Sequence, residues 1–161
     1  MTKRIAFAAA ALALAVPSFA QMTGDRGQAK VSLDGKTVSI DYGRPSLKGR
    51  DMLGQAVVGE AWRMGSNAPT TLKTDADLAF GTATVPKGEY VLKATTLDAD
   101  KWQLNVLAKL DQAKVADAPL VTKALPESVE QFTIDLSGAG KQGTLRLSWG
   151  KTALETTFTA K

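Results

Sequence analysis

Short runs of alternating apolar and polar residues, separated by turn residues, constrain the fold of this chain more than any other feature. Within residues 37–42, Val38, Ile40 and Tyr42 fall on one face, and the preceding Asp34-Gly35 pair is typical of a β-hairpin turn. Similar runs recur at 31–33, 72–74, 78–80, 89–96, 102–107, 129–136, 145–149 and 154–158. The pattern predicts an all-β fold: an antiparallel β-sandwich, jelly-roll-like or a partly closed barrel.

Two stretches lack this alternation. Residues 43–69 carry seven Gly or Pro, which predicts one long glycine-rich loop with a single helical turn near Glu60–Arg63. Residues 109–127 are ambiguous and allow a short helix. We therefore expect helix only in short pieces near 59–64 and 110–125, and we expect Leu145, Leu147 and Trp149, which share one face, to be buried.

The first twenty residues have the pattern of a cleavable export signal. Lys3 and Arg4 precede the uncharged run 5–16, and small residues at Ser18 and Ala20 fit cleavage after Ala20. Twelve residues of helix cover roughly 18 Å, short of the roughly 30 Å hydrocarbon core, so we expect no membrane anchor in the mature chain. We expect the mature protein to be periplasmic or secreted.

Cleavage leaves about 140 residues, the size of one domain. We expect residues 21–29 to form a flexible terminus and residues 30–161 to form a single β-rich domain. The chain has no cysteine and no histidine, which removes thiol, Ser-His-Asp and most transition-metal chemistry, so we expect no metal or other cofactor. The net charge of +4 includes Lys3 and Arg4, and the small remainder does not argue for a nucleic-acid partner.

The loop 43–69 and the strand before it hold the candidate site. Four cations lie near two aromatic residues and three carboxylates, and cations beside aromatic faces suit anions or sugars. We expect some of the cations to pair with Asp41, Asp51 or Glu60. The same residues would otherwise only fasten the loop to the sheet. The candidate ligand-binding residues are Asp41, Tyr42, Arg44, Lys48, Arg50, Trp62, Arg63 and Asn67.

A family resemblance rests on these residues. The strings DYGRPSLKGRDMLG, EAWRMGSNAPTTL, VPKGEYVL, KWQLNVLAK and LRLSWGK follow one another across residues 28–158. In this order the chain resembles the bacterial exported family called domain of unknown function 2911, which implies no established activity. The resemblance highlights the candidate site and adds Pro45, Gly49 and Gly65. The chain departs from the family at Ser66 and Ala68-Pro69, and it lacks an aromatic-rich stretch after Lys109.

Three functions are compatible with these patterns. The first is a non-catalytic binding module of the bacterial envelope, with a small anionic or carbohydrate ligand on the loop. The second is a carboxylate-dependent hydrolase, with Glu60 or Asp51 as general base and Arg63 holding an anion. The third is a structural or partner-binding protein that docks through a sheet edge. We expect Arg44, Arg50 and Arg63 to meet at one shallow cleft edged by Tyr42 and Trp62.

Overall fold

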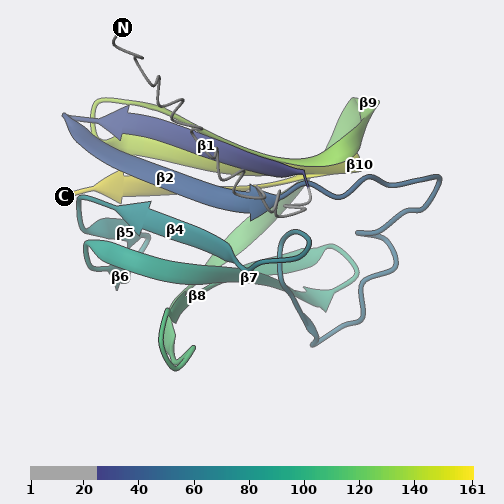
Figure 1. Ribbon diagram of the computed structural model, residues 1–161, viewed down its shortest axis with the longest axis horizontal. Coiled ribbons are helices and arrows are strands. Elements are labelled where there is room, and N and C mark those ends of the chain that lie inside the picture. Colours follow the sequence, from purple (N-terminus) through teal and green to yellow (C-terminus); the bar gives the residue numbers. More distant parts are fainter. Residues whose placement is uncertain (1–24) are drawn as a thin grey trace, which may run out of the picture.

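The computed structural model describes residues 25–161, so the expected export segment and its cleavage site lie outside the described residues. Ten strands make up one antiparallel sheet, in the order β1-β2-β4-β7-β8-β9-β10-β5-β6, with β3 paired to β7 (Figure 1). The strands are β1 (Arg26–Leu33), β2 (Lys36–Gly43), β3 (Ala61–Trp62), β4 (Thr70–Thr74), β5 (Leu78–Phe80), β6 (Ala83–Val85), β7 (Gly88–Asp98), β8 (Lys101–Ala108), β9 (Lys114–Ala139) and β10 (Gln142–Ala160).

The hairpin predicted at Asp34-Gly35 is present. Strand β1 pairs with β2 from Leu33↔Lys36 to Arg26↔Gly43. The two turn residues between them, Asp34 and Gly35, have φ values of 50° and 77°, the left-handed pair that a type I′ turn requires. Strands β7 and β8 form a second hairpin from two of the predicted alternating runs. The described residues contain no helix, which confirms the predicted all-β antiparallel fold.

The sheet folds over on itself, so that its two halves face one another. Strand β1 lies against β9, and the ring of Tyr42 on β2 packs edge-on to Phe132 on β9. The apolar faces of β2, β4, β7 and β8 meet those of β5, β9 and β10 around a void of only about 10 Å³. Among the described strands, β1 and β6 end the strand order and do not pair with each other, so the sheet is open. The core includes Leu145, Leu147 and Trp149, as predicted.

Strand β9 joins the two halves because it pairs on both sides. Its first part, up to Leu120, pairs with β8, and from Val121 onward it pairs with β10. The expected short helix near 110–125 is therefore wrong: residues 114–125 are strand. Two neighbouring strands supply more hydrogen bonds and buried area than an isolated helical turn, so they override the local sequence preference.

Two other expectations are also wrong. The helical turn near 59–64 is replaced by the two-residue strand β3, which pairs with Thr95 and Ala94 of β7. Residues 26–29, expected in a flexible terminus, form the start of β1 and pair with β2. In both places a neighbouring strand pairs with the backbone N–H and C=O groups, and the local sequence alone does not reveal that partner.

Candidate functional site

The long connection from β2 to β4 projects at one end of the sheet (Figure 1) and is fastened to both halves of it. Near its start, the Leu47 N–H donates to the Glu130 carbonyl of β9 at 3.0 Å, and the Phe132 N–H donates to the Pro45 carbonyl at 2.9 Å. Near its end, β3 pairs with β7. The connection is therefore held in place at two points.

Trp62 of β3 is the centre of an aromatic cluster beneath this loop. Its ring lies 5.0 Å from Phe132, 5.8 Å from Trp149 and 6.4 Å from Trp102, measured between centroids. The ring is partly buried. Trp62 thus anchors the loop to β8, β9 and β10, which is the structural role that the sequence left open for it. Its outer side lines a recess of about 330 Å³ together with Met52, Gln55 and Glu60.

Three of the candidate residues serve the sheet itself. The carboxylate of Asp41 pairs with Arg26 of β1. Tyr42 is 3% exposed, and its hydroxyl donates to the Ile134 carbonyl at 3.3 Å. The Arg44 guanidinium donates at 3.4 Å to the Phe132 carbonyl and to the Thr133 hydroxyl of β9. Tyr42 and Arg44 thus hold β2 against β9, and Asp41 joins β2 to β1.

Lys48 and Arg50 lie farther along the loop. The Lys48 backbone N–H donates to the Glu130 carboxylate at 3.0 Å. Arg50 lines a recess of about 430 Å³ between the loop and the β9–β10 pair. We call it the Arg50 recess, and its polar lining residues are Arg50, Asp51, Ser128, Glu130, Lys151 and Thr152.

Arg63 and Asn67 line a different recess of about 280 Å³, over β3, β4 and β7. We call it the Arg63 recess, and its polar lining residues are Arg63, Asn67, Thr70, Lys93 and Gln112. The Arg63 guanidinium donates to the Asn67 carbonyl at 3.1 Å, and the Lys93 ammonium donates to the Gln112 amide oxygen at 2.8 Å. The structure thus brings together two predicted residues and adds three polar ones that were not predicted, Thr70, Lys93 and Gln112.

The turn that carries Arg63 and Asn67 is rigidly built. Met64 is fully buried, and the hydroxyl of buried Thr70 donates to the Met64 carbonyl at 2.6 Å. Gly65 has a φ of 143°, and a Cβ on it would lie 2.8 Å from the Gly43 carbonyl oxygen. A glycine is therefore required for this close approach of the turn to β2. Asn67 has a φ of 63°, a left-handed conformation that Asn tolerates better than most residues.

The ionisable residues that line the Arg63 recess are all positively charged. Its two ionisable lining residues, Arg63 and Lys93, are both cations. Within residues 25–161, neither of them has a carboxylate within ion-pair distance. Each uses one hydrogen bond to a neutral oxygen, which leaves further N–H groups for a ligand. The recess can therefore bind a small anion through charge-assisted hydrogen bonds.

The four loop cations do not meet at one place. Arg44 contacts β9, Arg50 and Arg63 line separate recesses, and neither of these two recesses is lined by two of the four. The expected pairing is also wrong in the part of the chain that the structure describes: none of the four forms an ion pair with Asp41, Asp51 or Glu60. Asp41 is satisfied by Arg26 instead, and the Asp51 carboxylate accepts the Gly54 N–H at 3.0 Å.

The hydrolase arrangement is not assembled either. Glu60 lines the recess beside Trp62, Asp51 lines the Arg50 recess, and Arg63 lies in a third place. A general base and an arginine that holds an anion must both contact the same bound substrate, which these separate positions do not allow. Among the described residues, no group of three or more acidic side chains is placed to hold a metal ion.

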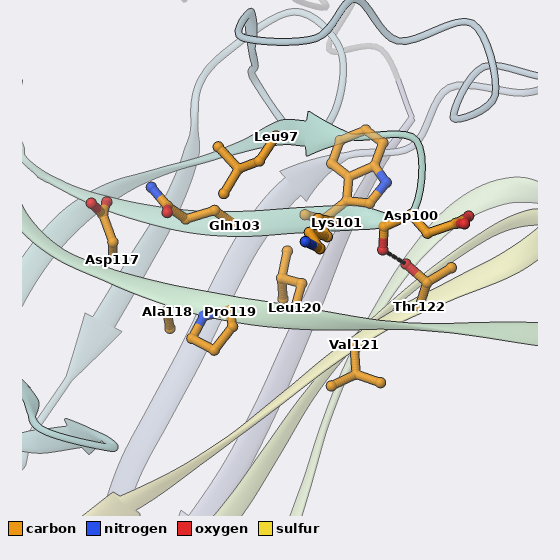
Figure 2. Close-up of a pocket in the computed structure, with 11 residues that line it drawn as sticks. Leu97, Asp100, Lys101, Gln103, Asp117, Ala118, Pro119, Leu120, Val121 and Thr122 are labelled. Atoms are coloured by element: carbon orange, nitrogen blue, oxygen red, sulfur yellow. Dashed lines mark hydrogen bonds between the residues drawn. The ribbon is translucent and has the colours of Figure 1, made fainter.

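A further recess, larger than those of Arg50 and Arg63, is an open groove of about 570 Å³ over β8 and β9, which the sequence did not predict. Figure 2 shows Gln103 and Asp117 at one end of it, and the Thr122 hydroxyl bonded to the Asp100 carbonyl at the other. Its Asp117 carboxylate is already occupied by the Lys114 ammonium and by the Asn105 amide at 2.9 Å. The groove combines exposed apolar side chains with charges of both signs, and it contains none of the candidate residues.

The fold and these recesses define a class: an open antiparallel β-sandwich with polar recesses formed by one long, anchored loop. The chain belongs to the family described as Protein of unknown function (DUF2911), whose model matches residues 25–158. This confirms the resemblance seen in the sequence. No curated protein and no solved structure matches the chain. Within residues 25–161, no helix is long and apolar enough to cross a membrane.

Proposed function

We propose that this protein is a non-catalytic binding module of the bacterial envelope and that it binds a small anionic ligand in the Arg63 recess. The observation that carries the proposal is the one-sided charge of this recess: Arg63 and Lys93 line it together with two amide side chains and no carboxylate. A guanidinium offers a planar fork that matches a carboxylate or phosphate, and an ammonium adds a second charge.

The rigidity of the turn supports the same function. Met64 and Thr70 are fully buried, and Gly65 lies against the backbone of Gly43, so Arg63 is carried by a fixed segment. A site whose backbone is fixed before binding loses less conformational entropy when the ligand arrives. The volume of about 280 Å³ suits a ligand the size of an inorganic oxyanion or one acidic sugar.

The test is a titration of the protein, produced without residues 1–20, with inorganic phosphate and with a matched pair of sugars, glucuronate and glucose. We expect glucuronate or phosphate to bind and glucose to bind much more weakly. Arg63→Gln and Lys93→Gln should each weaken binding at least about tenfold, because each removes a charge-assisted hydrogen bond.

The control variant is Lys36→Gln, which removes an exposed cation that does not line the recess. It should leave the affinity unchanged. Equal weakening by all three variants would show that only the net charge attracts the anion, and it would exclude the Arg63 recess as a specific site. Equal binding of glucose and glucuronate would exclude an anionic ligand and favour a neutral carbohydrate.

The location is part of the proposal. Support comes from the cationic start at Lys3-Arg4, the apolar run and the small residues at Ser18 and Ala20. Intact-mass measurement of the protein from an envelope fraction should give a chain that begins at Gln21. A chain that retains Met1 in that fraction would contradict cleavage after Ala20.

A further inference from the structure

The Arg50 recess differs from the Arg63 recess in the sign of its charges. Two cations, Arg50 and Lys151, and two carboxylates, Asp51 and Glu130, line it, and all four side chains are exposed. The recess lies where the loop crosses the β9–β10 pair. Here β10 has a register shift on each side of Gly150, whose φ is 62°. Such irregularities bend a strand locally and redirect its side chains.

The opposite charges around the recess do not neutralise one another. Within residues 25–161, no ion pair joins Arg50 or Lys151 to Asp51 or Glu130. Each carboxylate instead accepts one backbone N–H: Asp51 from Gly54 and Glu130 from Lys48, both at 3.0 Å. These bonds fix the carboxylates in place, and each carboxylate keeps a second oxygen for another donor.

A recess with separated, unpaired charges of both signs is complementary to a molecule that carries both charges. From this arrangement we infer that the Arg50 recess binds a zwitterion: an amino acid or a short peptide with a free α-ammonium and a free α-carboxylate. The cations would hold the carboxylate, and Asp51 and Glu130 would hold the ammonium. The volume of about 430 Å³ is within the range of small-molecule sites. The inference does not depend on the proposed anion site, because the two recesses share no lining residue.

The experiment is a titration of the protein with alanine, with alanyl-alanine and with trialanine, followed by chemical-shift changes in its ¹⁵N-¹H spectrum. The three lengths report the distance between the two charged ends that the recess prefers. We expect saturable shifts at 47–54, 128–130 and 150–152. The N-acetylated and the C-amidated forms of the best ligand should each bind at least about tenfold more weakly, because each loses one charge.

Two conservative variants locate the site. Glu130→Gln and Arg50→Gln each remove one charge, and the glutamine at 130 can still accept the Lys48 N–H. Glu130→Gln should weaken binding of the zwitterion but not of the N-acetylated form, which lacks the ammonium. Arg50→Gln should weaken binding of the zwitterion but not of the C-amidated form, which lacks the carboxylate. Lys36→Gln, which removes an exposed cation that lines neither recess, is the matched control and should leave the binding of all three forms unchanged.

The inference is wrong if the doubly blocked peptide binds as well as the free one, or if shifts at millimolar peptide are absent from these segments. It is equally wrong if Lys36→Gln weakens zwitterion binding as much as Arg50→Gln does. Loss of anion binding at the Arg63 recess would leave the result here unchanged, so the two proposals fail separately.

Discussion

The indole ring of Trp62 stacks on that of Trp149, with centroids 5.8 Å apart and ring planes inclined by 15°. Trp62 belongs to the two-residue strand β3 within the loop, whereas Trp149 belongs to β10 in the other half of the sheet. The Trp149 indole N–H also donates to the Glu130 carbonyl at 3.2 Å, so its one polar group is satisfied. This pair therefore connects the loop that forms the recesses to the core.

A double-mutant cycle measures that connection. Trp149 is 4% exposed, so Trp149→Ala should lower the free energy of unfolding by about 3–5 kcal/mol. Trp62→Ala should cost about 3 kcal/mol, the lower end of that range, because its ring is only partly buried. The double variant should lose about 0.5–1.5 kcal/mol less than the two single losses combined, which is the coupling of a packed aromatic pair.

Urea titration followed by circular dichroism gives these free energies. Leu110→Ala serves as the control, because Leu110 is fully exposed and its truncation should change stability little. Strict additivity of Trp62→Ala and Trp149→Ala would contradict a direct contact between the rings.

The sequence predicted those parts of the fold that depend on neighbours along the chain. Alternation identified β2, and Asp34-Gly35 identified the turn that sets the register of β1 and β2. Strand β3 could not be predicted, because two residues are too short for any period and only β7 makes them a strand. Residues 114–125 were misread for a similar reason: their alternation is weak, and pairing with β8 and β10 decides their conformation.

The candidate site, like the fold, was predictable only where its residues are neighbours along the chain. Arg63 and Asn67 lie four residues apart in one turn, so sequence proximity found both of them. Lys93 and Gln112 were not identified from the sequence, because β7 and the turn after β8 reach this recess only through strand pairing. Arg44 faces a strand backbone, and the sequence could not show this, because a cation next to glycine and proline looks the same whether it faces solvent or protein.

The close approach of Gly43 to the turn predicts a linked loss of stability and binding. A Cβ on Gly43 would lie 2.1 Å from the Ser66 carbonyl oxygen, so Gly43→Ala must displace the turn that carries Arg63. We expect a loss of about 1–3 kcal/mol, the range for overpacking, together with weaker glucuronate or phosphate binding. Thermal melts and the same titration measure both effects.

Gly49→Ala is the matched control for that substitution. Gly49 also lies in the loop, has a φ of 78° and has open space around its Cα. The new methyl group should cost about 1–2 kcal/mol through backbone strain alone and leave anion binding intact. Unchanged anion binding in Gly43→Ala would show that the turn tolerates the displacement.

The loss of stability at acidic pH should depend on Asp117. Partial burial acts to raise the pKa of Asp117, but hydrogen bonds from Lys114 and Asn105 and the charge of Lys114 outweigh it and lower that pKa. A carboxyl group with a lower pKa in the folded state stabilises the fold above its unfolded pKa of about 3.9, and the contribution is lost as the pH falls through the folded value. The free energy of unfolding should therefore fall below about pH 4.

The variant Asp117→Asn should show a shallower fall in stability over that acid range, because the group that takes up the proton is gone. Urea titrations at neutral and acidic pH compare the two proteins. Lys114→Gln should also make the fall shallower, since it removes the charge that lowers the pKa of Asp117. An acid slope in Asp117→Asn as steep as that of the unmodified protein would assign acid sensitivity to other carboxylates.

Arg44 and Arg63 should separate stability from binding. Arg44 lies between the strands: its guanidinium contacts Phe132 and Thr133 of β9, and its stem packs beside Gly27 of β1. Arg44→Gln should lower the free energy of unfolding by about 1 kcal/mol, because its two hydrogen bonds are long, and it should leave glucuronate or phosphate binding unchanged. Arg63→Gln should give the opposite result, near-unchanged stability with weakened binding. Melting curves with and without glucuronate measure both quantities in one series. If Arg63→Gln lowers stability and the unmodified protein shows no shift with either anion, Arg63 fastens the turn to Asn67 and the recess is not an anion site.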